Sequence, residues 1–451
     1  PLRVRYDKTN EFRRGFKNFG NAYHVAQSNW HSIHNPITIE MLTTGNNIPE
    51  TLDDSDIYYN KKSGGNNTKP MRDFHNLYVK NKLITSVSNA GNILIDYAVG
   101  KGGDLPKWIT AKLRFVLGID LSRDNIENRI DGACARYINY KKKFRVIPDA
   151  LFIHGNANKN IKKLEAQYSE KGKIITRAVF GEGLNDEKTI GRGVSKSFGI
   201  ANEGFDISSI QFAMHYMFQN AGILNEFLVN VAECTKLGGY FIGTCFDGKK
   251  VFNLLADKKE NESFIVMDRE RKNKLLEINK QYDKDTITDD ISCLGYAINI
   301  YQESINKTFK EYLVNFTYLT SVIENYGFVQ LTTEEANALG FNSGIGNFSD
   351  MFDFMNSEIK KQPEKKNDYG NAYKMTSQQK QISFLNKYFI FKKVRNVDIN
   401  DIKTNLTKID KYEEEKNVAL VEEQLEKVIE QSEIPKTIKV IKKTKIKKPE
   451  T

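Results

Sequence analysis

The chain has 451 residues, of which 39% are hydrophobic and 27% are charged. This length predicts two or three domains, and 21 Tyr and 27 Phe can build sizeable cores, so the composition excludes a wholly disordered chain. The net charge of +10 favours a polyanionic partner, although seven lysines of that excess lie between Pro435 and Pro449.

The chain begins at Pro1 rather than at a Met, and we expect it to be a fragment of a longer protein. Its longest apolar runs have the length of a strand, so no membrane-spanning segment is expected. The four cysteines are far apart and form no Cys-x-x-Cys pair. We therefore expect no metal site and a reducing intracellular setting.

The first part of the chain predicts a change from irregular to regular structure near Met71. Residues 1–35 form a basic, extended opening, and residues 36–70 read as a linker rich in Asn, Gly and Thr. An amphipathic helix follows Met71. The pattern then predicts strand 92–97, loop 98–103, helix 104–112, strand 114–119, helix 122–140 and strand 150–154. This alternation is typical of a parallel sheet with right-handed crossovers.

Residues 156–200 interrupt the alternation and are predicted to be an insertion on one face. The alternation resumes with strand 205–211, helix 225–236 and strand 240–246. A charged helix and hairpin strands are expected within 249–300, then helix 314–326, strand 327–332, a polar loop and a final strand 387–393. The two late strands suit a sheet that ends in an antiparallel hairpin. Residues 396–451 are predicted to be a charged tail.

The strongest local motif is the glycine-rich turn from Asp96 to Asp104, which reads D-Y-A-V-G-K-G-G-D, with Asp120 at the end of the next strand. Glycines allow a tight turn and a close approach of a ligand, and an acidic residue after the second strand can accept hydrogen bonds from a ribose diol. Both a nicotinamide dinucleotide and S-adenosylmethionine would fit such a turn.

Three details favour S-adenosylmethionine. The glycines do not follow G-x-G-x-x-G, which is the dinucleotide pattern. Asp96 and Asp104 would repel a pyrophosphate but attract a sulfonium and an amino group. Lys101 is not followed by Ser or Thr, so the turn is not a P-loop. A glycine-rich turn without any ligand is the remaining interpretation.

At this point the sequence resembles the mRNA cap guanine-N7 methyltransferases of eukaryotes and large DNA viruses over about residues 70–395. Four blocks carry the resemblance in the same order: D-x-x-x-G-K-G-G-D-L (96–105), FDISSIQFAMHY (205–216), LGGYFIGT (237–244) and EYLVNFTYL (311–319). The opening R-V-R-Y-D-K resembles the element that closes the OB-fold of RNA capping guanylyltransferases, with Arg3, Arg5, Asp7 and Lys8 as its polar residues.

This order of elements is that of the multifunctional capping enzymes of poxviruses and giant viruses. The resemblance implies a Rossmann-like class I α/β fold, a seven-stranded and mostly parallel sheet with an antiparallel last strand. It also implies a methyltransferase domain over 71–395, preceded by the end of a guanylyltransferase OB-fold. The implied reaction is transfer of a methyl group from S-adenosylmethionine to N7 of the cap guanine, which leaves S-adenosylhomocysteine.

For S-adenosylmethionine the resemblance implies seven residues. Lys80 would hold the methionine carboxylate, Asp96 and Gly100 would line the sulfonium end, and Asp120 would bind the ribose. Asn76 would lie one turn before Lys80, and Asn156 and Gln211 would meet the adenine. Ala98 stands where the family has a glycine, and an alanine at positive φ would cost ~1–2 kcal/mol.

For the cap the resemblance implies Phe212, His215, Tyr216, Glu311 and Tyr388. Guanine presents N–H donors along one edge, which a buried carboxylate such as Glu311 can accept together. Aromatic faces suit the base and its cationic methylated product. Guanine N7 already has a free lone pair, so the reaction requires alignment rather than proton abstraction, and no acid–base residue is expected.

Two alternatives remain from the sequence alone. One is a methyltransferase that acts elsewhere on RNA, and the other is an inactive RNA-binding or scaffold subunit. The expected partners are capped RNA, the upstream triphosphatase and guanylyltransferase domains of the same polypeptide and, as in poxviruses, a stimulatory subunit. A viral protein of this kind would act in the host cytoplasm or in the virion.

Overall fold

In a computed structural model the described residues are 68–270, 272–400 and 402, with isolated positions at 10, 13–15 and 43. The chain divides into two compact units, Pro1–Asp56 and Ile57–Thr451, and every element named below lies in the second. The motif formed by Arg3, Arg5, Asp7 and Lys8 and the acidic stretch after residue 402 lie outside the described residues.

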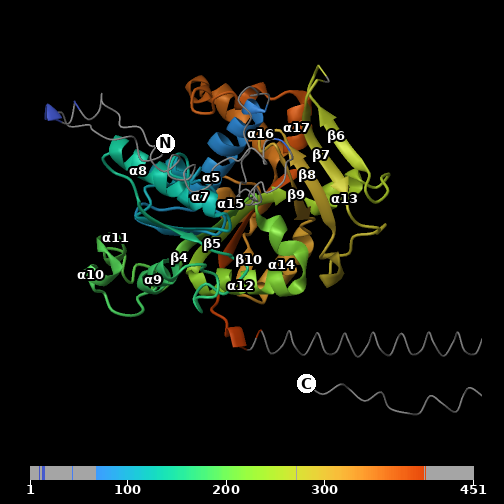
Figure 1. Ribbon diagram of the computed structural model, residues 1–451. Helices are drawn as coiled ribbons and strands as arrows, with labels where there is room; N and C mark the ends of the chain where they lie inside the picture. The colour runs from blue at the N-terminus through green and yellow to red at the C-terminus, as the bar shows by residue number, and fades with distance from the viewer. Residues whose placement is uncertain are drawn as a thin grey trace, which may run out of the picture. The chain divides into compact units, whose positions relative to one another are not determined.

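The second unit is built on one large sheet whose strands follow the order β10-β12-β5-β4-β1-β2-β3 (Figure 1). Strands β3, β2, β1, β4 and β5 are parallel to one another, whereas β12 is antiparallel to both β5 and β10. Their bounds are β1 Ile93–Asp96, β2 Phe115–Asp120, β3 Asp149–His154, β4 Phe205–Gln211, β5 Thr235–Phe246, β10 Phe328–Gln330 and β12 Asn386–Lys393. A short strand, β11 (Ile345–Asn347), adds to β12. The predicted class I fold with an antiparallel last strand is confirmed.

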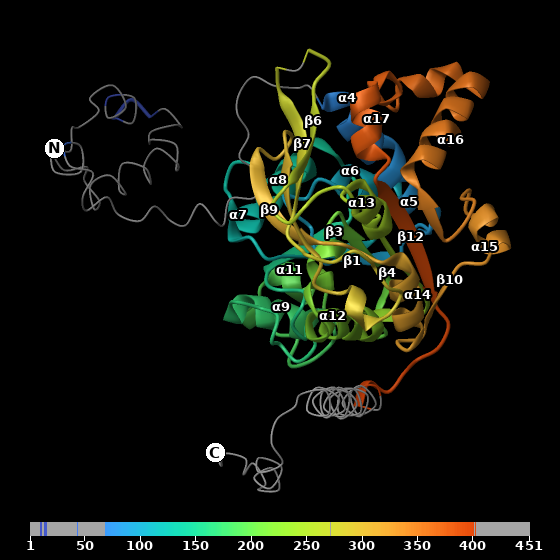
Figure 2. The ribbon, with the colours of Figure 1, turned by 90° about the vertical axis from the view of Figure 1, so that its right-hand side faces the viewer.

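Helices cover both faces of this sheet, and each cover encloses its own hydrophobic core. One face carries α4 (Lys69–Asp73), η2 (Phe74–Val79), α5 (Lys80–Ser86), α6 (Leu105–Thr110), α7 (Arg123–Glu127), α8 (Ala133–Lys143), α16 (Phe348–Lys361) and α17 (Ser377–Ser383). The other carries α9 (Glu170–Val179), α11 (Arg192–Ser195), α12 (Ala221–Cys234) and α14 (Phe316–Glu324). Figure 2 shows α16 and α17 on the opposite side of the sheet from α12 and α14.

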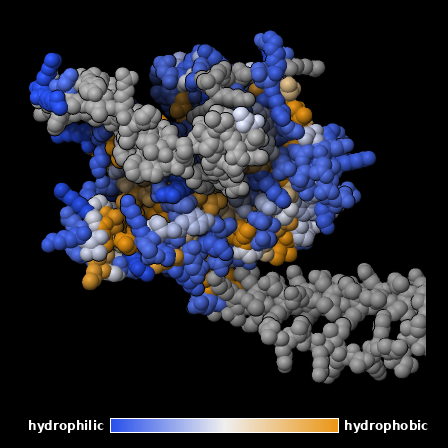
Figure 3. Space-filling view, in the orientation of Figure 1, coloured by the Kyte–Doolittle hydropathy of each residue, from blue (hydrophilic) through white to orange (hydrophobic). Residues whose placement is uncertain are grey.

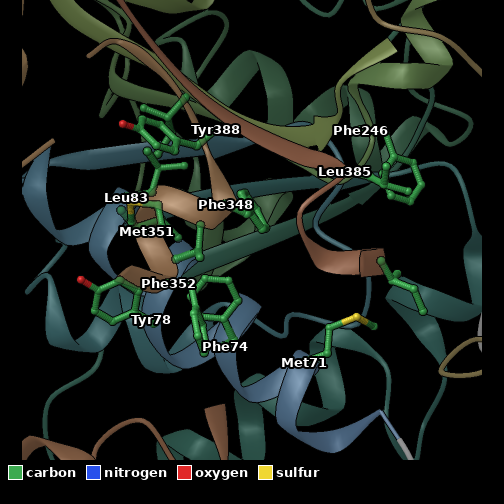
Figure 4. Close-up of a cluster of buried hydrophobic side chains, with 14 of the residues drawn as sticks. Met71, Phe74, Tyr78, Leu83, Phe246, Phe348, Met351, Phe352, Leu385 and Tyr388 are labelled. Atoms are coloured by element: carbon green, nitrogen blue, oxygen red, sulfur yellow. The ribbon is translucent and has the colours of Figure 1, made fainter. Parts of the chain in front are cut away.

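The first of these cores joins helices that are far apart in the sequence. Phe74 of η2 packs edge-on against Phe348 and Phe352 of α16, with ring centroids 6.1 and 5.4 Å apart (Figure 4). These rings are almost fully buried. The helix that leads into Lys80 is therefore fixed to the sheet by aromatic packing.

A second, four-stranded antiparallel sheet follows α13 (Gly248–Leu254). It consists of β6 (Ser263–Met267), β7 (Lys274–Lys280), β8 (Ala297–Gln302) and β9 (Lys307–Tyr312). Ile298 pairs with Glu311, so Glu311 projects from the same face as Ile298 and Ile300, which is buried. The surface over this sheet is mostly hydrophilic (Figure 3).

Two predicted segments are wrong. The expected helix 122–140 is two helices, α7 and α8, because the chain turns between them at Gly132, where an added Cβ would lie 2.6 Å from the carbonyl oxygen of Asn128. The expected polar loop before the last strand contains α15 (Thr333–Ala338), α16 and α17. Within the described residues, no helix is both long and apolar enough to cross a membrane.

Candidate active site

The glycine-rich turn connects β1 to α6 at the carboxyl end of the parallel strands. Gly100 has φ 55° and donates its N–H to Asp120 Oδ2 at 2.7 Å, which ties the turn to the end of β2. Gly102 has φ 68°. Among the described non-glycine residues, positive φ occurs only at Lys112, Leu164, Phe212, Asn261 and Asn306, so Ala98 is at negative φ and is not strained.

Three carboxylates gather around this turn, and all are buried. Burial and the neighbouring Asp104 carboxylate raise the pKa of Asp96 to about 7. Burial alone would raise the pKa of Asp104, but Lys107 and Lys80 together lower it to about 2. Burial also raises the pKa of Asp120, against hydrogen bonds from Asn125, Ser122 and Gly100.

Asp104 is the centre of a buried ion cluster that we call the Asp104 cluster. Its carboxylate lies 2.8 Å from Lys80 Nζ and 2.9 Å from Lys107 Nζ. Lys80 therefore lies at the glycine turn, as its predicted role requires, but its charge is already paired. Sequence reasoning missed Lys107, although its position three residues after Asp104 in a helix was a usable signal.

The other residues predicted for S-adenosylmethionine lie at the ends of neighbouring strands or on the helix before Lys80. Gln211 ends β4 and is buried, with its side chain hydrogen-bonded to Ser209 and Thr244. Asn156 follows β3, and its Oδ1 accepts from the N–H of Asn158. Asn76 Nδ2 donates to the carbonyl of Arg72. Their contacts with a ligand stay a prediction.

Two of the residues predicted for the cap, His215 and Glu311, come together where η3 (Met214–Gln219), which follows β4, meets β9. His215 and Glu311 are each only 5% exposed, and His215 Nδ1 lies 3.5 Å from Glu311 Oε2. Neither ring nitrogen of His215 nor Glu311 Oε2 has a hydrogen-bond partner within the described residues. Because an unpartnered buried polar group costs free energy, this pair fits a site that an incoming ligand completes.

Burial sets the protonation of this pair. It lowers the pKa of His215 to about 3 and raises the pKa of Glu311 to about 8. Near neutral pH the imidazole is therefore neutral and most of the Glu311 carboxyl is protonated. A ligand that presents N–H donors would favour the ionised carboxylate.

Two of the aromatic residues predicted for the cap, Phe212 and Tyr216, follow the end of β4. Tyr216 meets the ring of His215 edge-on, with centroids 4.3 Å apart. Phe212 directly follows β4 at φ 54°, an uncommon conformation for a bulky residue, and its N–H donates to the carbonyl of Thr244 at 2.8 Å. His75, which sequence reasoning missed, stacks on Phe212 with centroids 5.3 Å apart. Backbone strain of this kind is common at functional sites.

Tyr388 belongs to the packed core shown in Figure 4. Its hydroxyl donates to the carbonyl of Ser343 at 3.1 Å, and its ring packs beside Phe341. The role predicted for Tyr388 at the cap stays a prediction.

A cavity of about 580 Å³ lies at the opposite end of the strands from the glycine turn, where β5 begins and β12 ends. There Lys393 Nζ donates to the carbonyls of Ala232 and Thr235, so it satisfies the last turn of α12. This cavity is remote from the residues described above. In the described part of the chain no three His, Cys, Asp or Glu side chains are grouped to hold a metal ion.

Comparison with known proteins bears on this site. A family model described as "mRNA (guanine-N(7))-methyltransferase domain" matches residues 60–394. A probable mRNA-capping enzyme of Acanthamoeba polyphaga mimivirus is 29% identical over 429 residues, which cover 89% of this chain and 35% of that protein. The mRNA cap guanine-N(7) methyltransferase of Saccharomyces cerevisiae is 26% identical over 270 residues, which cover 57% of this chain and 50% of that protein.

The chain thus spans only part of the length of these two relatives. Among solved structures, an S-adenosylmethionine-dependent methyltransferase from Clostridium acetobutylicum aligns with 82% of this chain and 99% of its own, at 12% identity and a TM-score of 0.33.

Proposed function

Because the chain belongs to the mRNA (guanine-N(7))-methyltransferase family, we propose that it transfers a methyl group from S-adenosylmethionine to N7 of the terminal guanine of capped mRNA. The observation that carries the proposal is the buried, unpartnered pair of His215 and Glu311 beside the end of β4. This pair offers the acceptors that the N–H edge of guanine requires.

The glycine turn supplies the place for S-adenosylmethionine, which when bound there supplies an electrophilic methyl group. Asp96 and Asp120 present buried carboxyl groups at the ends of β1 and β2, where the positive charges and the ribose diol of that molecule find acceptors. The turn from Ala98 to Gly103 holds its only positive φ angles at glycines, Gly100 and Gly102. Lys80 is placed for the methionine carboxylate if it exchanges Asp104 for that group.

The residues of the cap site orient the acceptor. In this proposal Glu311 accepts from the guanine edge, and the rings of Phe212 and Tyr216 pack on the base. Held in this way, guanine needs no base to accept a proton, because the N7 lone pair is already free. Orientation of this kind can supply about 7–11 kcal/mol of the barrier.

The wider context follows the relatives. We propose that residues 71–395 are the methyltransferase domain of a multifunctional capping enzyme, that its substrate is the GpppN end of RNA, and that it acts in an infected cell or in the virion. A stimulatory subunit remains an expected partner. The scaffold alternative loses its main argument, since Ala98 is not at positive φ.

The decisive experiment transfers a labelled methyl group from S-adenosylmethionine to GpppA-capped RNA and separates the cap by thin-layer chromatography. Label in m7GpppA would support the proposal. Label elsewhere in the RNA would retain the methyltransferase fold but contradict the cap assignment. Absence of label, together with absence of S-adenosylhomocysteine binding by calorimetry, would favour the scaffold alternative.

A further inference from the structure

The end of α8 carries a group of cations that lack counter-charges. Residues 141–146, K-K-K-F-R-V, are all exposed. Lys142, Lys143 and Arg145 make no ion pair in the part of the chain that the structure describes. Lys141 and Lys196, the latter from the segment 156–200, lie 3.9 and 2.6 Å from the carboxylate of Asp149. Five cations therefore face one carboxylate, and we call residues 141–146 with Lys196 the α8 surface.

The α8 surface also presents an aromatic ring. Phe144 is 47% exposed and stacks on Tyr140, with centroids 5.5 Å apart and planes at 18°. A solvated lysine face does not require an exposed Phe held in a fixed orientation. Cations next to an exposed aromatic ring are the combination with which proteins bind single-stranded nucleic acid, because the cations meet phosphates and the ring stacks on a base.

The position of the α8 surface agrees with such a ligand. The first turn of α8 lies against the glycine turn, where a Cβ on Gly102 would be 3.5 Å from Cα of Ala133. Its last turn lies beside β3, the edge strand, where Lys141 of α8 and Lys196 both lie near Asp149. The path from the end of β4 to the end of α8 crosses three strand spacings and then follows the length of α8. Together these lengths give roughly 30 Å between the proposed cap site and the α8 surface. Several nucleotides of extended RNA would span that path.

We propose that the α8 surface binds the single-stranded RNA that follows the cap. This inference rests on the proposed function. Lys142, Lys143 and Arg145 pair with successive phosphates, Phe144 stacks on a base, and the segment 156–200 contributes Lys196. The surface thus recognises the body of the transcript and takes no part in the chemistry at the guanine.

The test compares the KM for the GpppA dinucleotide with the KM for a capped RNA long enough to reach the α8 surface. In the unchanged protein we expect the long RNA to have the lower KM. The double variant K142E/K143E should raise the KM of the long RNA about tenfold. It should also lower the slope of log KM against log salt concentration by the amount that corresponds to about two phosphate contacts. Phe144→Ala should also raise it, by about tenfold, through lost stacking. Methylation of the dinucleotide should remain unchanged.

The matched control is K360E/K361E. These two lysines are also adjacent, exposed, without an ion pair within the described residues, and in the last turn of a helix, α16. Equal effects of the two double variants would overturn the proposal, because net charge alone would then explain them. An equal KM for the dinucleotide and the long RNA in the unchanged protein would also overturn it. An acidic protein would then be the better candidate partner of the α8 surface. If the unchanged protein does not methylate the GpppA dinucleotide at all, the proposed function itself is contradicted.

Discussion

The two ends of the candidate active site solve the problem of buried charge in opposite ways. Around the glycine turn, Asp104 pairs with Lys80 and Lys107, so each buried charge has a partner of opposite sign within the chain. At the cap site, His215 and Glu311 are equally buried but lack partners, and burial keeps both largely neutral. The first end is internally paired, whereas the second leaves buried polar atoms that, in the proposed function, the cap guanine would satisfy.

This difference predicts that substitutions at the two ends have different effects, on stability at the first end and on ligand recognition at the second. Removing the carboxylate of a paired buried cluster leaves uncompensated charge, so it should destabilise the fold. Removing a group that has no partner in the free protein should cost little stability but should remove recognition. Three predictions test this contrast.

The largest effect is expected at the Asp104 cluster. Asp104→Asn leaves the buried ammonium groups of Lys80 and Lys107 without a counter-charge and should lower the free energy of unfolding by about 3–5 kcal/mol. Urea denaturation followed by circular dichroism measures this loss. Asp353→Asn, on an exposed position of α16, is the control and should change little. Equal stability of Asp104→Asn and the unchanged protein would show that the cluster is not a structural unit.

A smaller effect, on activity rather than stability, is expected at the cap site. Glu311→Gln should lower kcat/KM for capped RNA about a hundredfold, or about 3 kcal/mol, because the amide cannot replace a carboxylate that accepts from the guanine edge. Its free energy of unfolding should be unchanged or higher. Calorimetry with S-adenosylhomocysteine is the control measurement. A parallel loss of that affinity would mean that Glu311 supports the whole fold and not the cap.

The smallest effect concerns pH. Since burial raises the pKa of Asp96 to about 7, this carboxyl is protonated in the free protein below that pH, and it then cannot balance a cationic ligand. The affinity for S-adenosylmethionine should therefore fall below pH 7, by at most about tenfold per pH unit. The same argument places the loss of cap affinity below pH 8, at Glu311.

Titration calorimetry between pH 6 and 9 would separate the two windows, and Asp96→Asn should flatten only the first. If the affinity for S-adenosylmethionine does not change between pH 6 and 8, Asp96 does not contact a charged part of that ligand.

The sequence predicted the sheet better than it predicted the parts around it. Strand 205–211 was predicted with the bounds that β4 has, and it begins directly after Gly204, which has φ 96°. Helix α16 was missed although Phe348, Met351, Phe352 and Met355 recur at helical spacing, because the polar residues between them suggested a loop. The prediction therefore left out one of the helices that enclose the first core.

The site divides in the same way. The glycine turn could be predicted from its residues, since spacing and charge there are local. The burial of Glu311 could not, because it depends on the register of β9 with β8 and on the contact with η3, which are remote in the chain. Only the family resemblance pointed to it. The pairing of Lys80 with Asp104 was also beyond reach, since the two residues lie on different helices.

The place of β12 in the sheet has a consequence for how the protein is made. This strand is the last of the described elements, yet it lies between β5 and β10. Until residue 393 has emerged from the ribosome, β5 has an unpaired edge and β10 has no neighbouring strand to pair with. Because unpaired edges invite association with other chains, the nascent protein passes through a long interval of exposure. The sheet can close only after nearly the whole domain has left the ribosome, so the domain cannot complete its fold strand by strand as it is made.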